Sequence, residues 1–457
     1  MNKKIIVTTT IGTITLLVGL LVLFGIHFQN KNTQINTLNG TVLSKENKKI
    51  MLQDKDNNIY TFEANEMEVK TGSNIVLEYT GLLNKNIELQ DVSITNYNTM
   101  TVELDESGIP SDWQDNGIFS NYYTLAYNKM KTLSLEEKTA QLLLVRYPDS
   151  SPVETLKNYQ FGGYVFYEKD FRNKTKEQVK EMMSNLQQVA KIPILTAVDE
   201  EGGKVVRISS NTNLASEKFA SPSSLYATGG FNLIQEDTIK KSNLLKSLGL
   251  NLNLAPVVDV TTDPSAYMYE RTLGQGTALT STYAKTVIQA SKGTGVSYTL
   301  KHFPGYGNNA DTHTGSATDT RTYDDLLAND LPPFEAGIDA GAEAILVSHN
   351  IVTSIDPDNP ASLSPSIHNL LRNQLNFTGI TIADDLSMGA VSSIDNAAVK
   401  AILAGNDLII TTNYKQDISA IKQAINDGTL SETTIEKLAM RVIAWKYYKG
   451  LLFENQK

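Results

Sequence analysis

One short stretch of the sequence, from Lys301 to His313, gathers side chains that can bind and transfer protons. It contains a lysine, an aspartate and two of the five histidines of the chain. Asp311 and His313 stand two positions apart, so the carboxylate can hold one imidazole nitrogen while the other nitrogen faces a substrate. The stretch follows an apolar, β-prone run at residues 296–300, which predicts a functional loop at the exit of a buried strand. A solvated surface loop with satisfied histidines is the simpler alternative.

This stretch belongs to a longer pattern of alternating strands and helices. Segments with helical periodicity, such as residues 175–190, 280–290 and 396–404, separate most of the apolar runs. Largely apolar strands are typical of a parallel sheet covered by helices. Eight such units within residues 120–457 predict an α/β fold, a closed (β/α)8 barrel of the TIM type, with a doubly wound open sheet as the alternative. The predicted strands are residues 141–147, 161–167, 192–199, 250–260, 296–302, 344–349, 379–384 and 407–412.

Polar side chains collect where the predicted strands end. In a barrel of this type the catalytic groups lie at the carboxyl ends of the strands. A single carboxylate at such a position is readily explained as the cap of the next helix. Lysine and histidine do not cap helix N-termini, so the whole set instead predicts an active site at one rim. The strand-end residues are Asp199, Asp259, Lys301, His302, His349, Asp384 and Asp385.

Five motifs in the second part of the chain support a resemblance to a known family. They are VDEEGGKVVR at residues 198–207, ERT at 270–272, KHFPG at 301–305, DTH at 311–313 and ADDLSM at 383–388. From about residue 133 onward the chain resembles a family 3 glycoside hydrolase of the single-barrel bacterial β-N-acetylhexosaminidase type. Two positions depart from the usual pattern, because Tyr306 replaces a second histidine after HFPG and Thr312 replaces the more common serine of the triplet.

The resemblance implies a role for each matching residue. Asp384 is expected to be the nucleophile, His313 the general acid/base and Asp311 its partner. Strand alternation by itself leaves both Asp384 and Asp385 open as the nucleophile. No metal and no cofactor are expected, although a cluster of histidine and carboxylate side chains also suggests zinc. The residues expected to bind a terminal N-acetylglucosamine are Asp199, Arg207, Arg271, Lys301 and His302, with His349 lining the site.

The activity implied by the resemblance is that of a retaining exo-β-N-acetylglucosaminidase. Its expected substrates are glycans or muropeptides that carry a terminal N-acetylglucosamine, such as peptidoglycan fragments. One alternative is a phosphorylase, because some histidine-using relatives pass the glycosyl group to phosphate. A second alternative, from a different class, is a non-catalytic protein that binds the cell wall.

The first part of the chain predicts a membrane anchor at residues 1–29. Lys3 and Lys4 precede residues 5–28, which contain no Asp, Glu, Lys or Arg and are long enough to cross a bilayer core of about 30 Å. A cleaved signal peptide has a shorter apolar run and a cut site of small residues. The two lysines predict a cytoplasmic N-terminus, and therefore a single-pass membrane protein whose catalytic domain is extracellular.

Residues 38–98 are predicted to form a small antiparallel, barrel-like β domain. Short alternating segments at 41–43, 49–52, 59–62 and 74–79 are separated by turn residues. The domain offers no catalytic motif, so a spacer or wall-binding role is expected. The net charge of −10 argues against a nucleic-acid partner, and the absence of cysteine excludes disulfides and thiolate metal sites.

Overall fold

The computed structural model divides the chain into two compact units, Met1–Leu104 and Asp105–Lys457. It describes residues 35–46, 48–54, 59–64, 67–69, 74–81, 83, 89, 92–99, 109–110, 113–307, 309, 312, 315 and 317–453. The predicted anchor at residues 5–28 and the predicted pair Asp311 and His313 lie outside these residues. Within the residues described, no helix has both the length and the apolar character needed to cross a membrane.

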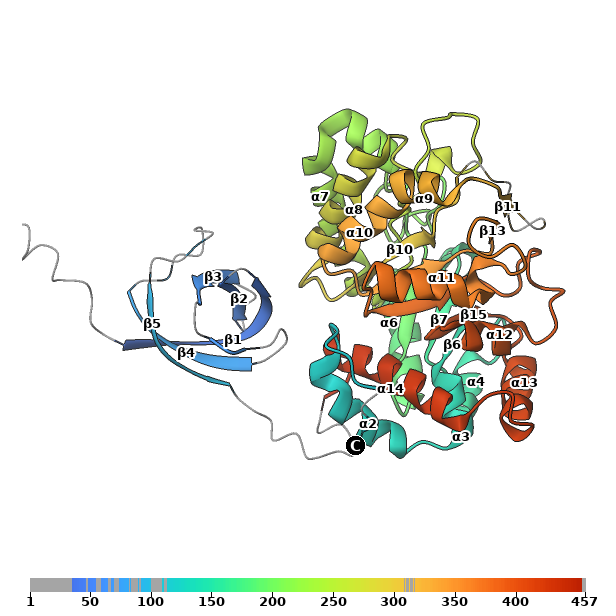
Figure 1. The fold of residues 1–457 in the computed structure, drawn as a ribbon, viewed down its shortest axis with the longest axis horizontal. Helices are drawn as coiled ribbons and strands as arrows, with labels where there is room; N and C mark the ends of the chain where they lie inside the picture. Colours follow the sequence, from blue (N-terminus) through green and yellow to red (C-terminus); the bar gives the residue numbers. More distant parts are fainter. Residues whose placement is uncertain are drawn as a thin grey trace, which may run out of the picture. The chain divides into compact units, whose positions relative to one another are not determined.

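The smaller unit contains a five-stranded antiparallel sheet in the order β3-β2-β1-β4-β5 (Figure 1). Alternation along the strands places Ile50, Leu52, Ile75 and Leu77 in its core, because successive side chains point to opposite faces. The predicted antiparallel β domain is confirmed, and its closure into a barrel stays a prediction. The strands are β1 (Ile35–Glu46), β2 (Lys49–Asp54), β3 (Ile59–Glu63), β4 (Asn74–Thr80) and β5 (Ser93–Thr99).

The larger unit is a closed parallel barrel whose strands follow one another in chain order. Every neighbouring pair is parallel, including the pair of last and first strands that closes the ring. Each predicted run overlaps one barrel strand, so the (β/α)8 prediction is confirmed and the open-sheet alternative is wrong. The strands are β6 (Leu143–Arg146), β7 (Gly163–Phe166), β8 (Leu195–Val198), β9 (Leu252–Asn253), β10 (Ser297–Phe303), β12 (Ala344–Val347), β14 (Ile380–Ala383) and β15 (Leu408–Thr411).

Helices lie between most of the barrel strands, and several begin with strong local signals. In α6, for example, the Thr175 side chain accepts a hydrogen bond from the Gln178 backbone N–H, which completes a capping box. The principal helices are α2 (Tyr123–Lys131), α3 (Leu135–Gln141), α4 (Pro152–Tyr159), α6 (Lys176–Val189), α7 (Pro222–Ser247), α8 (Thr277–Ser291), α9 (Tyr323–Asn329), α10 (Leu331–Asp339), α11 (Pro365–Asn369), α12 (Ala397–Ala404), α13 (Tyr414–Asn426) and α14 (Glu432–Tyr448). The predicted helices at 175–190, 280–290 and 396–404 correspond to α6, α8 and α12.

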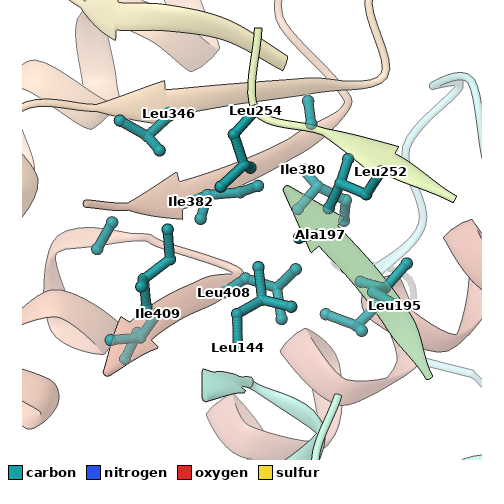
Figure 2. Packing of buried hydrophobic residues seen from close by; sticks show 14 of the residues in the cluster. Leu144, Leu195, Ala197, Leu252, Leu254, Leu346, Ile380, Ile382, Leu408 and Ile409 are labelled. Atoms are coloured by element: carbon teal, nitrogen blue, oxygen red, sulfur yellow. The ribbon is translucent and has the colours of Figure 1, made fainter. Parts of the chain in front are cut away.

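The interior of the barrel is filled by apolar side chains from most of its strands. Figure 2 shows residues such as Leu144, Ala197, Leu254, Ile382 and Leu408 packed against one another between the strands. All five are nearly or completely removed from solvent. The barrel is therefore a packed core rather than a channel, and polar chemistry is confined to its two ends.

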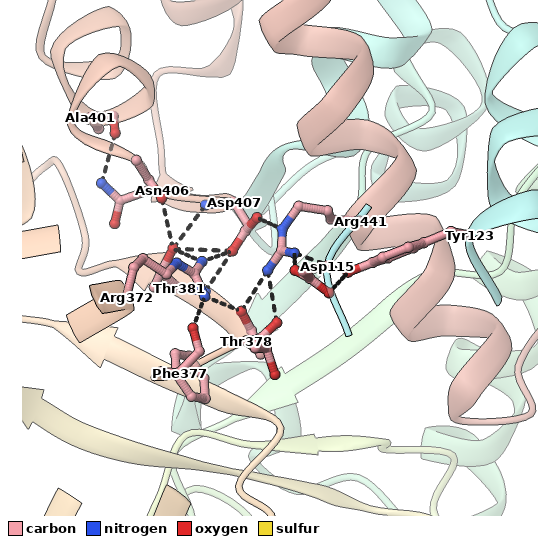
Figure 3. A network of polar contacts seen from close by, with 12 residues as sticks. Asp115, Tyr123, Arg372, Phe377, Thr378, Thr381, Ala401, Asn406, Asp407 and Arg441 are labelled. Atoms are coloured by element: carbon pink, nitrogen blue, oxygen red, sulfur yellow. Dashed lines mark hydrogen bonds and ion pairs between the residues drawn. The ribbon is translucent and has the colours of Figure 1, made fainter. Parts of the chain in front are cut away.

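A buried ion cluster closes the end of the barrel at which β15 begins. The Asp407 carboxylate accepts hydrogen bonds from Arg441 of α14 and from Arg372, each at 2.6 Å, and its side chain has no exposed surface. Arg441 also donates to the Thr378 and Gly379 carbonyls that lead into β14 (Figure 3). Burial alone would raise the pKa of the Asp407 carboxyl, but the two guanidiniums outweigh burial and hold that pKa below its usual value. The cluster ties the last helix to the barrel.

We expect Asp407→Asn to lower the free energy of unfolding of the barrel unit by about 3–5 kcal/mol, because it removes the buried carboxylate that the Arg372 and Arg441 guanidiniums share and leaves Arg441 with Asp115 as its remaining ion-pair partner. Denaturant unfolding followed by tryptophan fluorescence measures this change. Both tryptophans of the chain, Trp113 and Trp445, lie buried in the barrel unit, so the signal reports that unit alone. The matched control is Glu217→Gln, which breaks an exposed ion pair with Lys240 and should leave the midpoint unchanged. An equal effect of both variants would contradict the assignment.

Candidate active site

A cavity of about 470 Å³ opens at the carboxyl end of the barrel strands. Six of the predicted site residues line it, and they come from the loops or ends of four different strands. The six are Asp199, Arg207, Arg271, Lys301, His302 and Asp384. Barrel closure thus brings together side chains that are as much as 185 positions apart in the chain, taking 384 minus 199.

Buried charges of alternating sign form one wall of this cavity. The Lys301 ammonium lies 2.7 Å from Asp199 and 2.8 Å from Glu201, and Glu201 also accepts hydrogen bonds from Arg271 at 2.6 and 2.9 Å. Burial opposes ionisation of each group, but the opposite charges outweigh it, so the pKa of Lys301 is raised and the pKa values of Asp199 and Glu201 are lowered. All of these groups are therefore charged at neutral pH and can make strong, charge-assisted hydrogen bonds to a polar ligand.

Arg207 and His302 extend the polar wall. The Arg207 guanidinium lies 3.7 Å from Asp199. The His302 Nδ1 lies 2.7 Å from the Asp259 carboxylate, and its Nε2 lies 3.4 Å from the Arg271 guanidinium. The second Asp259 oxygen accepts a hydrogen bond from the Tyr306 backbone N–H at 2.7 Å. Asp259 therefore orients the imidazole ring and also the start of the loop that follows it.

The two adjacent aspartates after β14 are held differently. Asp384 is half-buried, and its Oδ1 accepts the Asp385 backbone N–H at 2.8 Å. Both oxygens of Asp385 are engaged, one by the Ser387 backbone N–H at 2.9 Å and the other by the Tyr167 hydroxyl at 3.4 Å. Strand alternation cannot distinguish the roles of the two carboxylates, but their hydrogen bonds can. Asp385 shapes the loop, and the Asp384 carboxylate, which also lines the cavity, is the less engaged of the two.

The other predicted site residues differ in their placement. His349 is buried outside the cavity lining, and its Nε2 lies 3.1 Å from the Asp385 carbonyl while its Nδ1 lies 2.7 Å from the Ser362 hydroxyl. His349 therefore contacts the backbone of the loop that carries Asp384, on the side away from the cavity lining. Asp311 and His313 are outside the described residues, and their expected roles stay predictions. Among the residues that the structure describes, no three His, Asp or Glu side chains form a metal-binding group.

Several lining residues were not predicted from the sequence. Arg146 and Tyr167 stand at the ends of the first two predicted strands, and their position at a strand end was an available signal. The Arg146 guanidinium lies 4.2 Å from the centre of the Tyr167 ring. Glu201 lies within a motif already noted, where three consecutive carboxylates hid its role. Tyr267, in the long loop after β9, gave no signal in the sequence.

Comparison with known proteins identifies the family. The glycosyl hydrolase family 3 N-terminal domain matches residues 134–445. A β-hexosaminidase of Xanthomonas campestris pv. campestris is 32% identical over 298 residues, which cover 64% of this chain and 88% of that protein.

Solved structures give the same result. A family 3 β-N-acetylglucosaminidase from Paenibacillus sp. is similar with a TM-score of 0.65 and 28% identity, covering 70% of this chain and 63% of that one. LpqI of M. tuberculosis is similar with a TM-score of 0.63 and 28% identity, covering 69% of this chain and 95% of that one. The match spans the barrel unit and the motifs that line its cavity. The chain therefore belongs to glycoside hydrolase family 3 and resembles the β-N-acetylhexosaminidases of that family.

Proposed function

We propose that this glycoside hydrolase is a retaining exo-β-N-acetylglucosaminidase. The observation that carries the proposal is the cavity at the barrel rim, where the Asp384 carboxylate faces the same space as the buried charges of Asp199, Lys301 and Arg271. A carboxylate beside a dense set of fixed donors and acceptors suits attack on a sugar whose hydroxyls are held in place. The hexosaminidase relatives support N-acetylglucosamine as that sugar.

In the first step, the Asp384 carboxylate attacks the anomeric carbon from the face opposite to the leaving group. His313 donates a proton to the departing oxygen, so the leaving sugar departs as a neutral alcohol and a glycosyl-enzyme ester remains. Histidine is an unusual donor among glycosidases, but its ordinary pKa of about 6.5 lies near working pH. Asp311 is expected to orient the ring and stabilise the imidazolium form.

In the second step, His313 takes a proton from a water molecule as that water attacks the anomeric carbon. The ester bond to Asp384 breaks and the product retains the β configuration. Asp199, Lys301 and Glu201 undergo no proton transfer in this scheme, because each is held charged by its neighbours. Their role is to bind and orient the terminal sugar throughout.

The proposal includes the natural substrate and the place of action. The apolar run at residues 5–28 after two lysines supports a single-pass membrane anchor with the catalytic unit outside the cell. Peptidoglycan fragments with a non-reducing N-acetylglucosamine are the fitting substrate at that location. A protein that only binds the wall is disfavoured, because binding alone does not require a half-buried carboxylate at the centre of a charged cavity.

Asp384→Asn should lower the hydrolysis of an aryl β-N-acetylglucosaminide by at least about a thousandfold, because the amide cannot form the ester intermediate. The matched control is Asp385→Asn, which removes a neighbouring carboxylate that we assign to loop structure. Initial rates, together with tryptophan fluorescence to verify folding, make the comparison. Near-normal turnover by Asp384→Asn would overturn the assignment, and so would a greater loss in Asp385→Asn.

His313→Gln should lower kcat/KM by about 10²–10⁴-fold, the usual effect of losing a proton-transfer group. The high-pH limb of the kcat/KM profile should also disappear, because that limb reports deprotonation of the proton donor, whereas the low-pH limb reports ionisation of the nucleophile and should remain. Rates measured between pH 5 and pH 8 test both statements. An unchanged pH profile in the variant would show that a different residue supplies the proton.

A phosphorylase is the second candidate activity, because a histidine acid/base repels an incoming phosphate less than a carboxylate does. For the hydrolase, we expect free N-acetylglucosamine as the product in the presence and in the absence of phosphate. Chromatography of the products separates the free sugar from its 1-phosphate. Accumulation of the sugar phosphate, at a rate that increases with phosphate concentration, would favour the phosphorylase.

A further inference from the structure

The two positions at which the chain departs from the usual family motifs contact each other. The Tyr306 hydroxyl accepts a hydrogen bond from the Thr312 backbone N–H at 2.9 Å and lies 2.9 Å from the Thr312 hydroxyl. Both residues are buried, with 4% and 1% of their surfaces exposed. A phenol can accept from one group while it shares a proton with another, so one hydroxyl serves both contacts.

Tyr306 is itself rigidly placed. Its backbone N–H is bound by Asp259, the carboxylate that also orients His302. Its ring packs with Val257 and Met268 in a small apolar cluster, and meets the His302 ring edge-on with centres 5.6 Å apart. A side chain fixed at its backbone and along its ring can hold whatever its hydroxyl binds.

Thr312 connects this tyrosine to the loop of the nucleophile. The Thr312 carbonyl accepts the Ala390 backbone N–H at 3.1 Å. Ala390 lies in the loop that follows β14 and Asp384. The residue between Asp311 and His313 is thus held from one side by the sugar-binding wall and from the other by the nucleophile loop.

We propose that Tyr306 is a positioning residue for proton transfer, which fixes Thr312 and thereby the acid/base pair on either side of it. The inference rests on the proposed function, in which His313 is the proton donor. Without the phenol hydroxyl, the buried Thr312 N–H loses its acceptor, and an unsatisfied buried donor favours a shift of the backbone. Because catalysis is sensitive to displacements of about 1 Å, such a shift weakens proton donation without removing any catalytic group.

The test is Tyr306→Phe in the full chain, with two substrates that need different amounts of protonation. A phenyl β-N-acetylglucosaminide has a poor leaving group and depends on the proton donor, whereas the 2,4-dinitrophenyl analogue departs with little help. We expect kcat/KM to fall by about tenfold for the phenyl substrate and by less than about twofold for the dinitrophenyl substrate. A structural role alone would lower both rates equally, and that result would overturn the proposal.

The matched control is Tyr298→Phe, which removes another buried tyrosine hydroxyl, here from strand β10. Tyr298 bonds Ser242 and the Thr238 carbonyl on α7, outside the cavity lining, so both substrates should retain their rates. Two substitutions at position 312 give a graded comparison, because both keep the backbone N–H that the phenol accepts. Thr312→Ser also keeps the hydroxyl contact and should retain the phenyl rate, whereas Thr312→Val loses only that contact and should have a smaller effect than Tyr306→Phe. A leaving-group effect of equal size in Tyr298→Phe would count against a specific role of Tyr306.

Hydrogen–deuterium exchange separates failure of this inference from failure of the proposed function. Amide exchange of the peptide that contains Thr312 should increase in Tyr306→Phe, since its N–H has lost its acceptor. This readout does not depend on the substrate. An inactive wild-type protein would refute the proposed activity, whereas unchanged exchange at Thr312 would refute the positioning contact.

Discussion

The buried ammonium of Lys301 is the constraint on which the active end of the barrel depends. A charge removed from water is costly unless counter-charges and hydrogen bonds surround it. Its partners Asp199 and Glu201 come from the loop after β8, and Arg271 comes from the loop after β9. These groups meet only if the barrel closes in the observed register, because a shift of one residue would turn Lys301 to the other face of the sheet. Correct folding and the proposed recognition of a sugar therefore depend on the same contacts.

The two ends of the barrel use buried ions for different purposes. At one end, Asp407 is enclosed by two arginines and a backbone N–H, and its side chain has no exposed surface. At the other end, the charges of Asp199 and Glu201 border a cavity of about 470 Å³, so their remaining hydrogen-bonding capacity faces a space that a sugar can fill. The apolar interior between them keeps the ends separate. Stability and chemistry are thus assigned to opposite ends of the same strands.

The barrel could be predicted from the sequence because each strand is a short apolar run followed by polar residues. The strand ends also identified five charged or polar residues of the cavity wall, Asp199, Lys301, His302, Asp384 and Asp385. The position of a strand end does not show which of two adjacent carboxylates enters the cavity. Glu200 accepts the Arg207 and Ile208 backbone N–H groups at 2.7 Å, while its neighbour Glu201 binds Lys301 and Arg271. The sequence cannot distinguish the roles of these two glutamates, because each role depends on the direction in which the side chain points.

The two departures from the family motifs are a second case in which the sequence alone does not show how residues act together. Compared position by position, Tyr306 and Thr312 are independent replacements in different motifs, and neither changes a predicted catalytic residue. In space they form one contact, with the hydroxyl of each residue 2.9 Å from the other. A longer side chain at position 306 reaches the triplet, and a hydroxyl at position 312 receives it. The two replacements are therefore best understood together, because the tyrosine hydroxyl that one of them supplies contacts the side chain that the other supplies.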